Sequence, residues 1–525
     1  MPKIISAEAA AGLIPNDAVV AVSSSSGLAC PEATLAAIGN RFDMDRHPHG
    51  LTMLLPIAAG DFYGIKGIDH LAKKGMIART ICGSYPSGPS NAEPPLIWQM
   101  IGRNEIAAYN VPSGILFDML REAAAYRPGV LTKVGLDTFV DPNREGCAMN
   151  AAAAKAAIVK HVAFEGEDYL YFPAIAPNVA IIRATTADER GNLSFEHEGA
   201  YLGVMELAQA AHNTGGVVIA QVKRVVAGGS LRTHDVRVPG ILIDYIVEAP
   251  DQWQCTHTTY DPAISGEVIR PLASFEPMPF GVGKAIARRV ARELKAGWAV
   301  NLGFGVSANV PRILLEEGRH GTVTWVIEQG AVGGIPLLDF QFGCSANAEA
   351  IVASPQQFTY FQAGGFDATL LSFLQIGADG SVNVSRLGVR PHVTAGAGGF
   401  VDITSRAKRI VYSGFFNAGA KLEIESGKLK IIAEGKVKKL VREVEQVSFS
   451  GRRGVAQDQS VTYITERCVM QLTPDGIIVT EIAPGADLER HILAQSEFPL
   501  KVAPDLKPMD AALFRPEHMG AILDA

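Results

Sequence analysis

A chain of 525 residues is too long for one hydrophobic core, so two domains are the first expectation. The net charge is only −7 and no long basic block is present, which argues against a nucleic-acid partner. Six widely spaced cysteines without a C-x-x-C pair favour reduced thiols and argue against a zinc site or a disulfide framework.

The N-terminal region begins with a predicted helix from Ile4 to Ile14, with Ser6 as its N-cap. Glu8 and Asp17 interrupt its apolar residues, so the stretch is a poor signal peptide. No apolar run reaches the roughly 18 residues that a membrane span needs. We therefore expect a cytoplasmic protein.

The first half of the chain predicts an alternation of strands and helices. An apolar strand at 17–23 leads through a small-residue loop, Ser23 to Gly27, into a helix that begins near Pro31. Further strands are predicted at 51–57, 181–185, 217–222 and 241–247, and further helices at 95–103 and 113–125. The segment 251–279 is rich in proline and polar residues, and we interpret it as a linker.

After the linker, a helix at 285–296 carries several basic residues, which we expect on a solvated outer face: Arg288, Arg289, Arg292 and Lys295. A strand at 298–302, a loop at Gly303-Phe304-Gly305 and a helix at 310–317 follow. This unit resembles the one at 19–38, and the turn at 188–194 is echoed at 378–385. The order of these matches predicts an α/β protein of two tandem similar open domains, residues 1–272 and 280–525.

One carboxylate, that of Glu328, follows the β-prone run 323–327 and precedes a glycine-rich loop containing Gly330, Gly333 and Gly334. A carboxylate at such a position can act as a nucleophile, with loop N–H groups close to a developing oxyanion. An ordinary acid at a strand end, followed by a turn, gives the same pattern.

A second interpretation comes from the loop Gly303-Phe304-Gly305, which follows a strand and fits G-x-G-x-x-A. Glu328 lies about 20 residues further on, where a dinucleotide fold places its ribose-binding acid. This pattern leaves a nicotinamide-dependent oxidoreductase as an alternative. A ribose-binding acid does not require the Gln-Gly-Ala-Val-Gly-Gly segment that follows Glu328, and a nucleophile beside an oxyanion hole does.

The segment 328–336 resembles the active-site segment of family I CoA-transferases, in particular the single-chain acetate/propionate branch. Motifs in the same order extend the resemblance over nearly the whole chain: 133–142, 210–213, 301–305, 379–385, 396–403, 463–467 and 481–485. The resemblance implies the CoA-transferase type of fold, with the active site between the two domains.

The resemblance also implies a ping-pong exchange of CoA between a short-chain acyl-CoA and a carboxylate such as acetate or propionate. Glu328 would form an acyl anhydride and then a glutamyl-CoA thioester, with coenzyme A as substrate and covalent intermediate and no permanent cofactor or metal. The expected oxyanion and CoA-binding groups are Gly330, Gly333, Gly334, Asn383, Gly398 and Gly399. For Asn383, a structural role in the Asp-Gly-Ser-Val-Asn turn is an equal alternative.

This chain departs from the family pattern in two loops of the first half. Serines occupy Ser23 to Ser26 where related enzymes usually have paired glycines, and Ser113 stands where a longer polar residue is often found. The resemblance implies that Ser26, Gly27 and Ser113 contribute to the acyl pocket, so the acyl substrate stays open. An acyl-CoA hydrolase and a catalytically inactive CoA-binding protein stay open as rivals, and a homodimer or homotetramer is expected.

The segment Glu196-His197-Glu198 looks like a metal cluster on paper. Neighbouring side chains of a strand point to opposite faces, so these three are not expected to share one ion.

Overall fold

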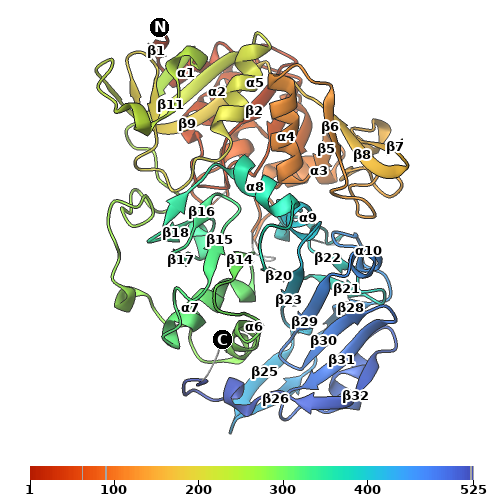
Figure 1. The fold of residues 1–525 in the computed structure, drawn as a ribbon. Coiled ribbons are helices and arrows are strands. Elements are labelled where there is room, and N and C mark those ends of the chain that lie inside the picture. Colours follow the sequence, from red (N-terminus) through yellow and green to blue (C-terminus); the bar gives the residue numbers. More distant parts are fainter. Residues whose placement is uncertain (62, 89–91, 389, 521–522, 524–525) are drawn as a thin grey trace.

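The computed structural model describes residues 1–61, 63–88, 92–388, 390–520 and 523. Two large sheets, one from each half of the chain, dominate the fold, as Figure 1 shows from the change of colour along the sequence. The segment between β13 (Tyr245–Glu248) and α6 (Val282–Ala291), which contains the predicted linker, has only a short 3-10 turn among its regular elements.

The first sheet runs in the order β1, β13, β11, β9, β2, β3, β4, β5. The strands other than β13 are β1 (Lys3–Ile5), β11 (Val217–Val226), β9 (Val179–Asp188), β2 (Val19–Val22), β3 (Leu51–Leu55), β4 (Ile77–Cys82) and β5 (Ala107–Asn110). These neighbours pair in parallel, and β10 (Leu193–Ser194) and β12 (Val236–Val238) attach beside β9. Ten consecutive residues of β9 are buried, as expected for a parallel strand covered on both faces.

The second sheet runs in the order β19, β16, β15, β14, β20, β23, β29, β30, β31, β32. Its strands are β19 (Ala350–Ile351), β16 (Ala331–Val332), β15 (Thr324–Val326), β14 (Ala299–Leu302), β20 (Ala368–Ser372), β23 (Arg409–Ser413), β29 (Ser460–Ile464), β30 (Cys468–Thr473), β31 (Gly476–Ile482) and β32 (Lys501–Pro508). The five strands from β15 to β29 pair in parallel, and antiparallel strands flank them.

The helices cover the sheets and the junction between them. The first half contains α1 (Ala7–Ala11), α2 (Glu32–Asp45), α3 (Leu96–Gly102), α4 (Ser113–Ala124) and α5 (Val204–Asn213). Besides α6, the second half contains α7 (Val310–Glu316), α8 (Ser354–Gln362), α9 (Phe400–Thr404), α10 (Gly451–Ala456) and α11 (Leu488–His491). Figure 1 shows α8 and α9 at the junction of the halves, next to α4.

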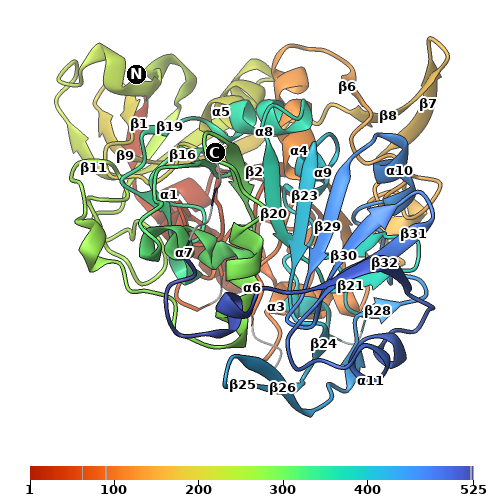
Figure 2. The same cartoon turned by 60° about the horizontal axis from the view of Figure 1, so that its bottom comes forward.

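Small sheets, all antiparallel except for the parallel pairing of β21 with β28, complete the described structure. A three-stranded sheet of β6 (Gly129–Thr132), β8 (Glu167–Pro173) and β7 (Lys160–Phe164) projects from the first half, as seen in Figures 1 and 2. The others are β17 (Ile335–Pro336) with β18 (Ser345–Ala346); β21 (Gln375–Gly377) with β22 (Val382–Asn383) and β28 (Leu440–Val441); β24 (Asn417–Ala418) with β27 (Val437–Lys438); and β25 (Lys421–Glu425) with β26 (Lys428–Ala433).

The core is continuous across the two halves. Two hydrophobic clusters lie within one half each, but a third contains residues of both. At the junction, the rings of Phe117 on α4 and Phe358 on α8 have centroids 5.9 Å apart. Burial of such large apolar side chains stabilises contact between the halves, so the loops at their facing edges have a defined relative position.

Three predictions about local structure are wrong. Residues 3–5 form β1 beside β13, so the first helix is only α1, although Ser6 caps it as predicted through a bond from the Ala9 N–H. The predicted strand 241–247 begins as a 3-10 turn, and only its end belongs to β13. In both cases pairing across the sheet edge, which no local pattern encodes, decided the boundary.

The third error concerns the basic face of α6. Arg288 is fully buried, and its guanidinium donates to the backbone carbonyls of Arg515 and Glu517. Arg289 forms an ion pair with Glu481 at 2.8 Å. The C-terminal segment and β31 therefore cover Arg288 and Arg289 through contacts between residues more than 190 positions apart, whereas Lys295 is exposed as predicted.

No helix in the described part of the chain combines the length and apolarity needed to cross a bilayer.

Candidate active site

Glu328 lies two residues beyond β15, at the carboxyl ends of the parallel strands of the second sheet. The chain turns there because the Gly330 N–H donates to the Ile327 carbonyl at 2.9 Å. Gly330 has φ +118°, and a Cβ at this residue would lie 1.9 Å from the carbonyl oxygen of Val352. This turn therefore requires glycine, which fixes where the preceding carboxylate points.

The Glu328 carboxylate meets one group from its own loop and one from a distant loop. The Gln329 side chain donates to Oε1 at 3.1 Å, and the Gly399 backbone lies against Oε2, where its N–H lowers the pKa of the carboxylate. A Cβ on Gly399 would lie 2.6 Å from Oε2, so only glycine allows this approach. Burial raises the pKa of Glu328 to about 7, although the Gln329 amide and the Gly399 N–H both favour the ionised form.

The side chain of Glu328 nevertheless keeps partial contact with solvent. A carboxylate that is accessible yet poorly solvated is a better nucleophile and base than an ordinary surface acid, and it ionises near neutral pH. Glu328 therefore has the properties that covalent catalysis requires.

The loop that carries Gly399 is bound to the facing edge of the first sheet. Asn110, the last residue of β5, accepts from the Ala397 N–H at 2.8 Å and donates to the Gly83 carbonyl at 2.6 Å. The Gly398 N–H also donates to Gly83, at 2.8 Å, and the Ser113 N–H donates to the Gly398 carbonyl at 3.0 Å. The carboxyl edges of the two sheets thus meet at this loop, and the first half holds it in place.

A second connection between the halves runs through Gln329. Its buried Nε2 donates both to Glu328 and to Ser25 Oγ, at 3.1 Å each. Ser25 belongs to the serine loop after β2, whose next residue, Ser26, is exposed. Gly27 packs against Thr256, where a Cβ would lie 1.9 Å from Oγ1. The structure thus brings the serine loop close to the Glu328 segment, with Ser25 as the residue in contact.

Several residues predicted for this site have other bonds. The N–H groups of Gly333 and Gly398 donate to the carbonyls of Trp325 and Gly83, both at 2.8 Å. Gly334 packs on β18, where a Cβ would lie 2.4 Å from the Ala346 carbonyl. Like the Gly330 N–H, the N–H groups of Gly333 and Gly398 maintain the loops in this structure, whereas Gly399 is the predicted glycine whose backbone lies against the Glu328 carboxylate.

The Asn383 side chain is fully buried and bonded within its own turn. Nδ2 donates to Gln375 and to the Arg386 carbonyl, both at 2.8 Å, and Oδ1 accepts from the Ser385 and Arg386 N–H groups. These contacts correspond to the alternative of a structural turn residue. Ser113 lies on the first turn of α4 beside Gly83, and its buried Oγ has no hydrogen-bond partner among the described residues.

Sequence reasoning did not include Ser25, Asn110 or Gln329 among the site residues. Asn110 had a usable signal, since it is a polar residue at the end of an apolar strand, as Glu328 is. Gln329 and Ser25 had no such signal, because their contact joins residues 304 positions apart.

The residues of the Glu196-His197-Glu198 segment have separate partners. Glu198 forms a buried ion pair with Arg183 at 3.0 Å, and Glu196 pairs with Arg224 at 2.7 Å. In the described residues, no group of three histidine, cysteine or acidic side chains is placed to hold a metal ion.

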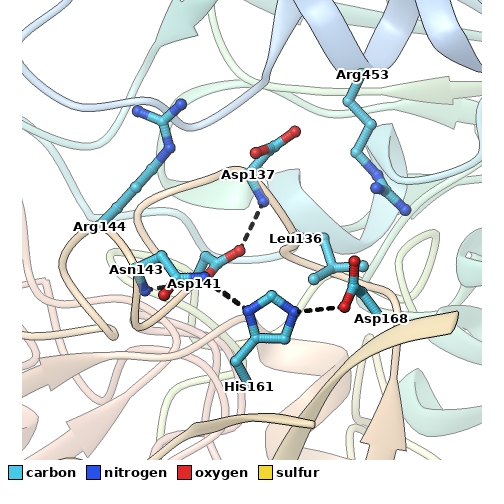
Figure 3. A pocket seen from close by; sticks show the side chains of 8 residues that line it. All are labelled: Leu136, Asp137, Asp141, Asn143, Arg144, His161, Asp168 and Arg453. Carbon is cyan, nitrogen blue, oxygen red and sulfur yellow. Dashed lines mark hydrogen bonds and ion pairs between the residues drawn. The ribbon is translucent and has the colours of Figure 1, made fainter. Parts of the chain in front are cut away.

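A polar cavity of about 390 Å³ lies near β7 and α10 and is drawn in Figure 3. It is lined by Leu136, Asp137, Asp141, Asn143, Arg144, His161, Asp168 and Arg453. Its carboxylates have partners: Asp168 faces His161 at 3.2 Å, Asp137 pairs with Arg452 at 2.6 Å, and Asp141 accepts from the backbone of Asn143 at 2.9 Å. These contacts tie together the loop 136–144, so we regard the cavity as structural.

Comparison with known proteins connects this geometry to a chemistry. The coenzyme A transferase family model matches residues 4–249. A caffeate CoA-transferase from Acetobacterium woodii is 39% identical, with 99% of each chain covered. The acetate CoA-transferase YdiF from Escherichia coli strain K12 is 36% identical over 99% of this chain and 96% of its own length.

Solved structures agree with these relatives. The apoenzyme of the acyl-CoA transferase YdiF from Escherichia coli O157:H7 superposes with a TM-score of 0.92, at 35% identity, over 99% of this chain and 98% of that chain. A second structure of that enzyme, a thioester complex with CoA, gives 0.91. The expected fold class is confirmed, and the dinucleotide alternative finds no support among these relatives. The chain belongs to the coenzyme A transferase family.

Proposed function

We propose that this protein transfers CoA between a short-chain acyl-CoA and a carboxylate, with Glu328 as the nucleophile. The Glu328 carboxylate attacks the thioester carbonyl, and the C–S bond breaks to give an acyl-glutamyl anhydride and CoA thiolate. The thiolate then attacks the glutamyl carbonyl, which releases the first acid and leaves a glutamyl-CoA thioester. An acceptor carboxylate takes the same steps in reverse and restores Glu328.

This proposal rests on the Glu328 carboxylate, which lies next to a glycine-rich turn where the edges of the two sheets meet. It stays partly accessible to solvent, and its pKa is raised. The solved thioester complex of YdiF with CoA supports a covalent CoA intermediate for a relative of the same length and fold. Each step exchanges one activated acyl group for another, so the thioester's free energy is conserved through the cycle.

The Gly399 N–H is our candidate for stabilising the oxyanion of the tetrahedral intermediates. Gly399 lies beside the carboxylate at which those intermediates form, and its N–H lowers the pKa of that carboxylate. Loss of one such donor typically costs about 3–4 kcal/mol of transition-state stabilisation.

Acetate and propionate are the acids we propose first, in accord with the relative that is named for acetate. The position of Phe358 favours a small acyl group. Its Cε1 and Glu328 Oε2 each lie 2.6 Å from the point that a Cβ on Gly399 would occupy, so the space beside the carboxylate is narrow. Ser26, Gly27 and Ser113 stay proposed contributors to the acyl pocket. Another relative is named for caffeate, so activity with a caffeoyl-CoA donor tests the choice of short-chain acids.

The test is a panel of acyl-CoA donors, acetyl, propionyl and caffeoyl, each assayed with and without acetate. We expect fast exchange with the short donors, parallel double-reciprocal lines, and a CoA adduct on the Glu328 peptide when no acceptor is present. Borohydride reduction should trap that adduct. Rapid release of CoA without a carboxylate acceptor would identify a hydrolase instead, and absence of an adduct with every donor would exclude Glu328 as the nucleophile.

We further propose that residues 1–272 and 280–525 are the two domains and that the protein works in the cytoplasm as a homo-oligomer. The first division is supported by the two sheets, each built from strands of one side of the linker. The continuous core predicts that the two parts unfold together, which calorimetry would show as one transition.

A further inference from the structure

A second buried carboxylate lies three residues after Gly399. Asp402 belongs to α9, its side chain is fully buried, and each of its oxygens accepts one hydrogen bond. Oδ2 accepts from the Gly114 N–H at 3.0 Å, and Oδ1 accepts from Gln362 Nε2 at 2.9 Å. No cation contacts this carboxylate among the described ion pairs, which is unusual because an unpaired buried charge is costly.

The two donors come from different halves of the chain. Gly114 lies in the first turn of α4, where free backbone N–H groups and the helix dipole favour a carboxylate. Gln362 ends α8 in the second half and also donates to Asp118 of α4 at 3.3 Å. Asp402 therefore joins three helices that meet at the junction of the halves.

The contact with α4 depends on a glycine. A Cβ on Gly114 would lie 2.5 Å from Asp402 Oδ1 and 2.7 Å from Gln362 Nε2. The backbone of Gly114 does not need a left-handed conformation, so the close approach of Asp402 is the reason for glycine here.

The same carboxylate controls the position of the Gly399 amide. Gly399 is the N-cap of α9, and its carbonyl accepts from the Ile403 N–H at 2.9 Å within this five-residue helix. A helix this short is not stable alone, so its orientation depends on tertiary contacts. Because Asp402 supplies polar contacts from α9 to both α4 and α8, displacing it would move the Gly399 backbone that lies against the Glu328 carboxylate.

Charge links the two carboxylates as well. Burial is the main cause that raises the pKa of Asp402 to about 7, and the charges of Asp118 and Glu328 raise it further, against the bonds from Gln362 and Gly114. The groups that face it are thus Asp118, paired with Arg121 at 2.6 Å, and Glu328. Because the coupling is reciprocal, a charge on Asp402 must also hinder ionisation of Glu328.

We propose that Asp402 is a positioning residue of the transfer reaction, which holds the Gly399 amide against Glu328 by bonding to Gly114 and Gln362. The proposal rests on the proposed role of Glu328 for its kinetic consequence, but the position of the α9 loop can be measured without activity.

The experiment compares four variants by steady-state kinetics from pH 5.5 to 9 and by amide hydrogen exchange of residues 395–403. Asp402→Asn keeps the shape and removes the charge. Asp402→Ala removes both bonds, and Gly114→Ala displaces the carboxylate while leaving its charge. Glu206→Gln neutralises a half-buried acid on α5, whose pKa burial also raises, and serves as the matched control.

We expect Asp402→Ala and Gly114→Ala to lower kcat by roughly 10- to 100-fold, with KM for acyl-CoA changed less than threefold, because a small misplacement of the site is costly. Exchange at 395–403 should become faster in both. Asp402→Asn should keep most of kcat, and the acid limb of its pH profile should move to lower pH, since a nearby like charge is gone. Glu206→Gln should match the wild type in every measurement.

Wild-type kcat and wild-type exchange at 395–403 in both Asp402→Ala and Gly114→Ala would overturn the proposal. If the wild-type protein shows no transfer with any donor, the proposed function fails, and hydrogen exchange alone decides the role of Asp402. The proposal would also fail if the acid limb of the pH profile stayed at its wild-type position in Asp402→Asn and hydrogen exchange at 395–403 stayed at its wild-type rate in Asp402→Ala.

Discussion

The two halves of this protein share one arrangement of strands but contribute different things to the site. In the first sheet the order β13, β11, β9, β2, β3 matches β29, β23, β20, β14, β15 in the second, and all of these pairs are parallel. The turn after β9 and the turn between β21 and β22 also correspond, since Asp188 and Asp379 both accept from backbone N–H groups two residues on.

The difference lies at the carboxyl ends of equivalent strands. β15 leads to Glu328, whereas its counterpart β3 leads to the apolar residues Pro56, Ile57 and Ala58. The first half instead uses β4, β5 and α4 to bind the loop that presents Gly399. A duplicated fold therefore separates two positions: the second half carries the proposed nucleophile, Glu328, and the first half binds the loop that lies against it.

The largest effect should come from Glu328 itself, which has no counterpart in the first half. Glu328→Ala should abolish exchange, by more than about 10⁴-fold, because removal of a nucleophile leaves only binding. Glu328→Asp withdraws the carboxylate by one methylene, which should cost at least roughly 100-fold while leaving some hydrolysis through an oriented water. Exchange rates and intact masses measure both, and near-wild-type exchange by folded Glu328→Ala would remove this residue from the mechanism.

A methyl group at Gly399 tests the approach of the distant loop. Gly399→Ala would place Cβ 2.6 Å from both Glu328 Oε2 and Phe358 Cε1, so we expect kcat to fall roughly 100-fold. The matched control is Gly102→Ala at the end of α3, where a Cβ meets no atom within 4 Å. Equal kcat values for the two variants would contradict the close approach of Gly399.

Asn110→Ala removes a side chain of the first half that binds the Gly399 loop, and it leaves Glu328 unchanged. It removes the bonds to Ala397, Gly83 and Cys82, so we expect kcat to fall about 10-fold and unfolding to become easier by about 2–3 kcal/mol. Asn150→Ala is a suitable control, because Asn150 makes comparable bonds to Ile101, Ile106 and Ala153. A similar loss of kcat in both variants would indicate general destabilisation.

The smallest expected effect is the pH dependence of the intact enzyme. Only ionised Glu328 can attack, so kcat/KM should rise with pH and level off above an apparent pKa of about 7. Below that value activity should fall about tenfold per unit of pH. Because Asp402 titrates in the same range, the apparent value belongs to the pair of carboxylates. If the acid limb of the pH profile instead lies near pH 4.5, the ordinary pKa of a glutamate, then Glu328 is well solvated.

Local sequence patterns predicted most elements and singled out Glu328 as the candidate nucleophile. Apolar runs predicted β2, β3, β9, β11, β14 and β15, and Ser6 was correctly placed as a helix cap. Glu328 followed from an acid at a strand end before a glycine-rich turn, because backbone geometry at Gly330 and Gly333 is a local property. The repeated order of strand, loop and helix predicted the duplicated fold.

The tertiary structure alone decided which groups surround that carboxylate. The pairing of β1 with β13, the burial of Arg288 under the C-terminal segment, and the contacts of Ser25, Asn110 and Asp402 all join residues far apart in the chain. Such contacts leave no periodicity in a sequence, because each depends on how two separately formed edges meet. Glu328 could be read from its neighbours, but its pKa of about 7 arises only from the burial that both halves create together.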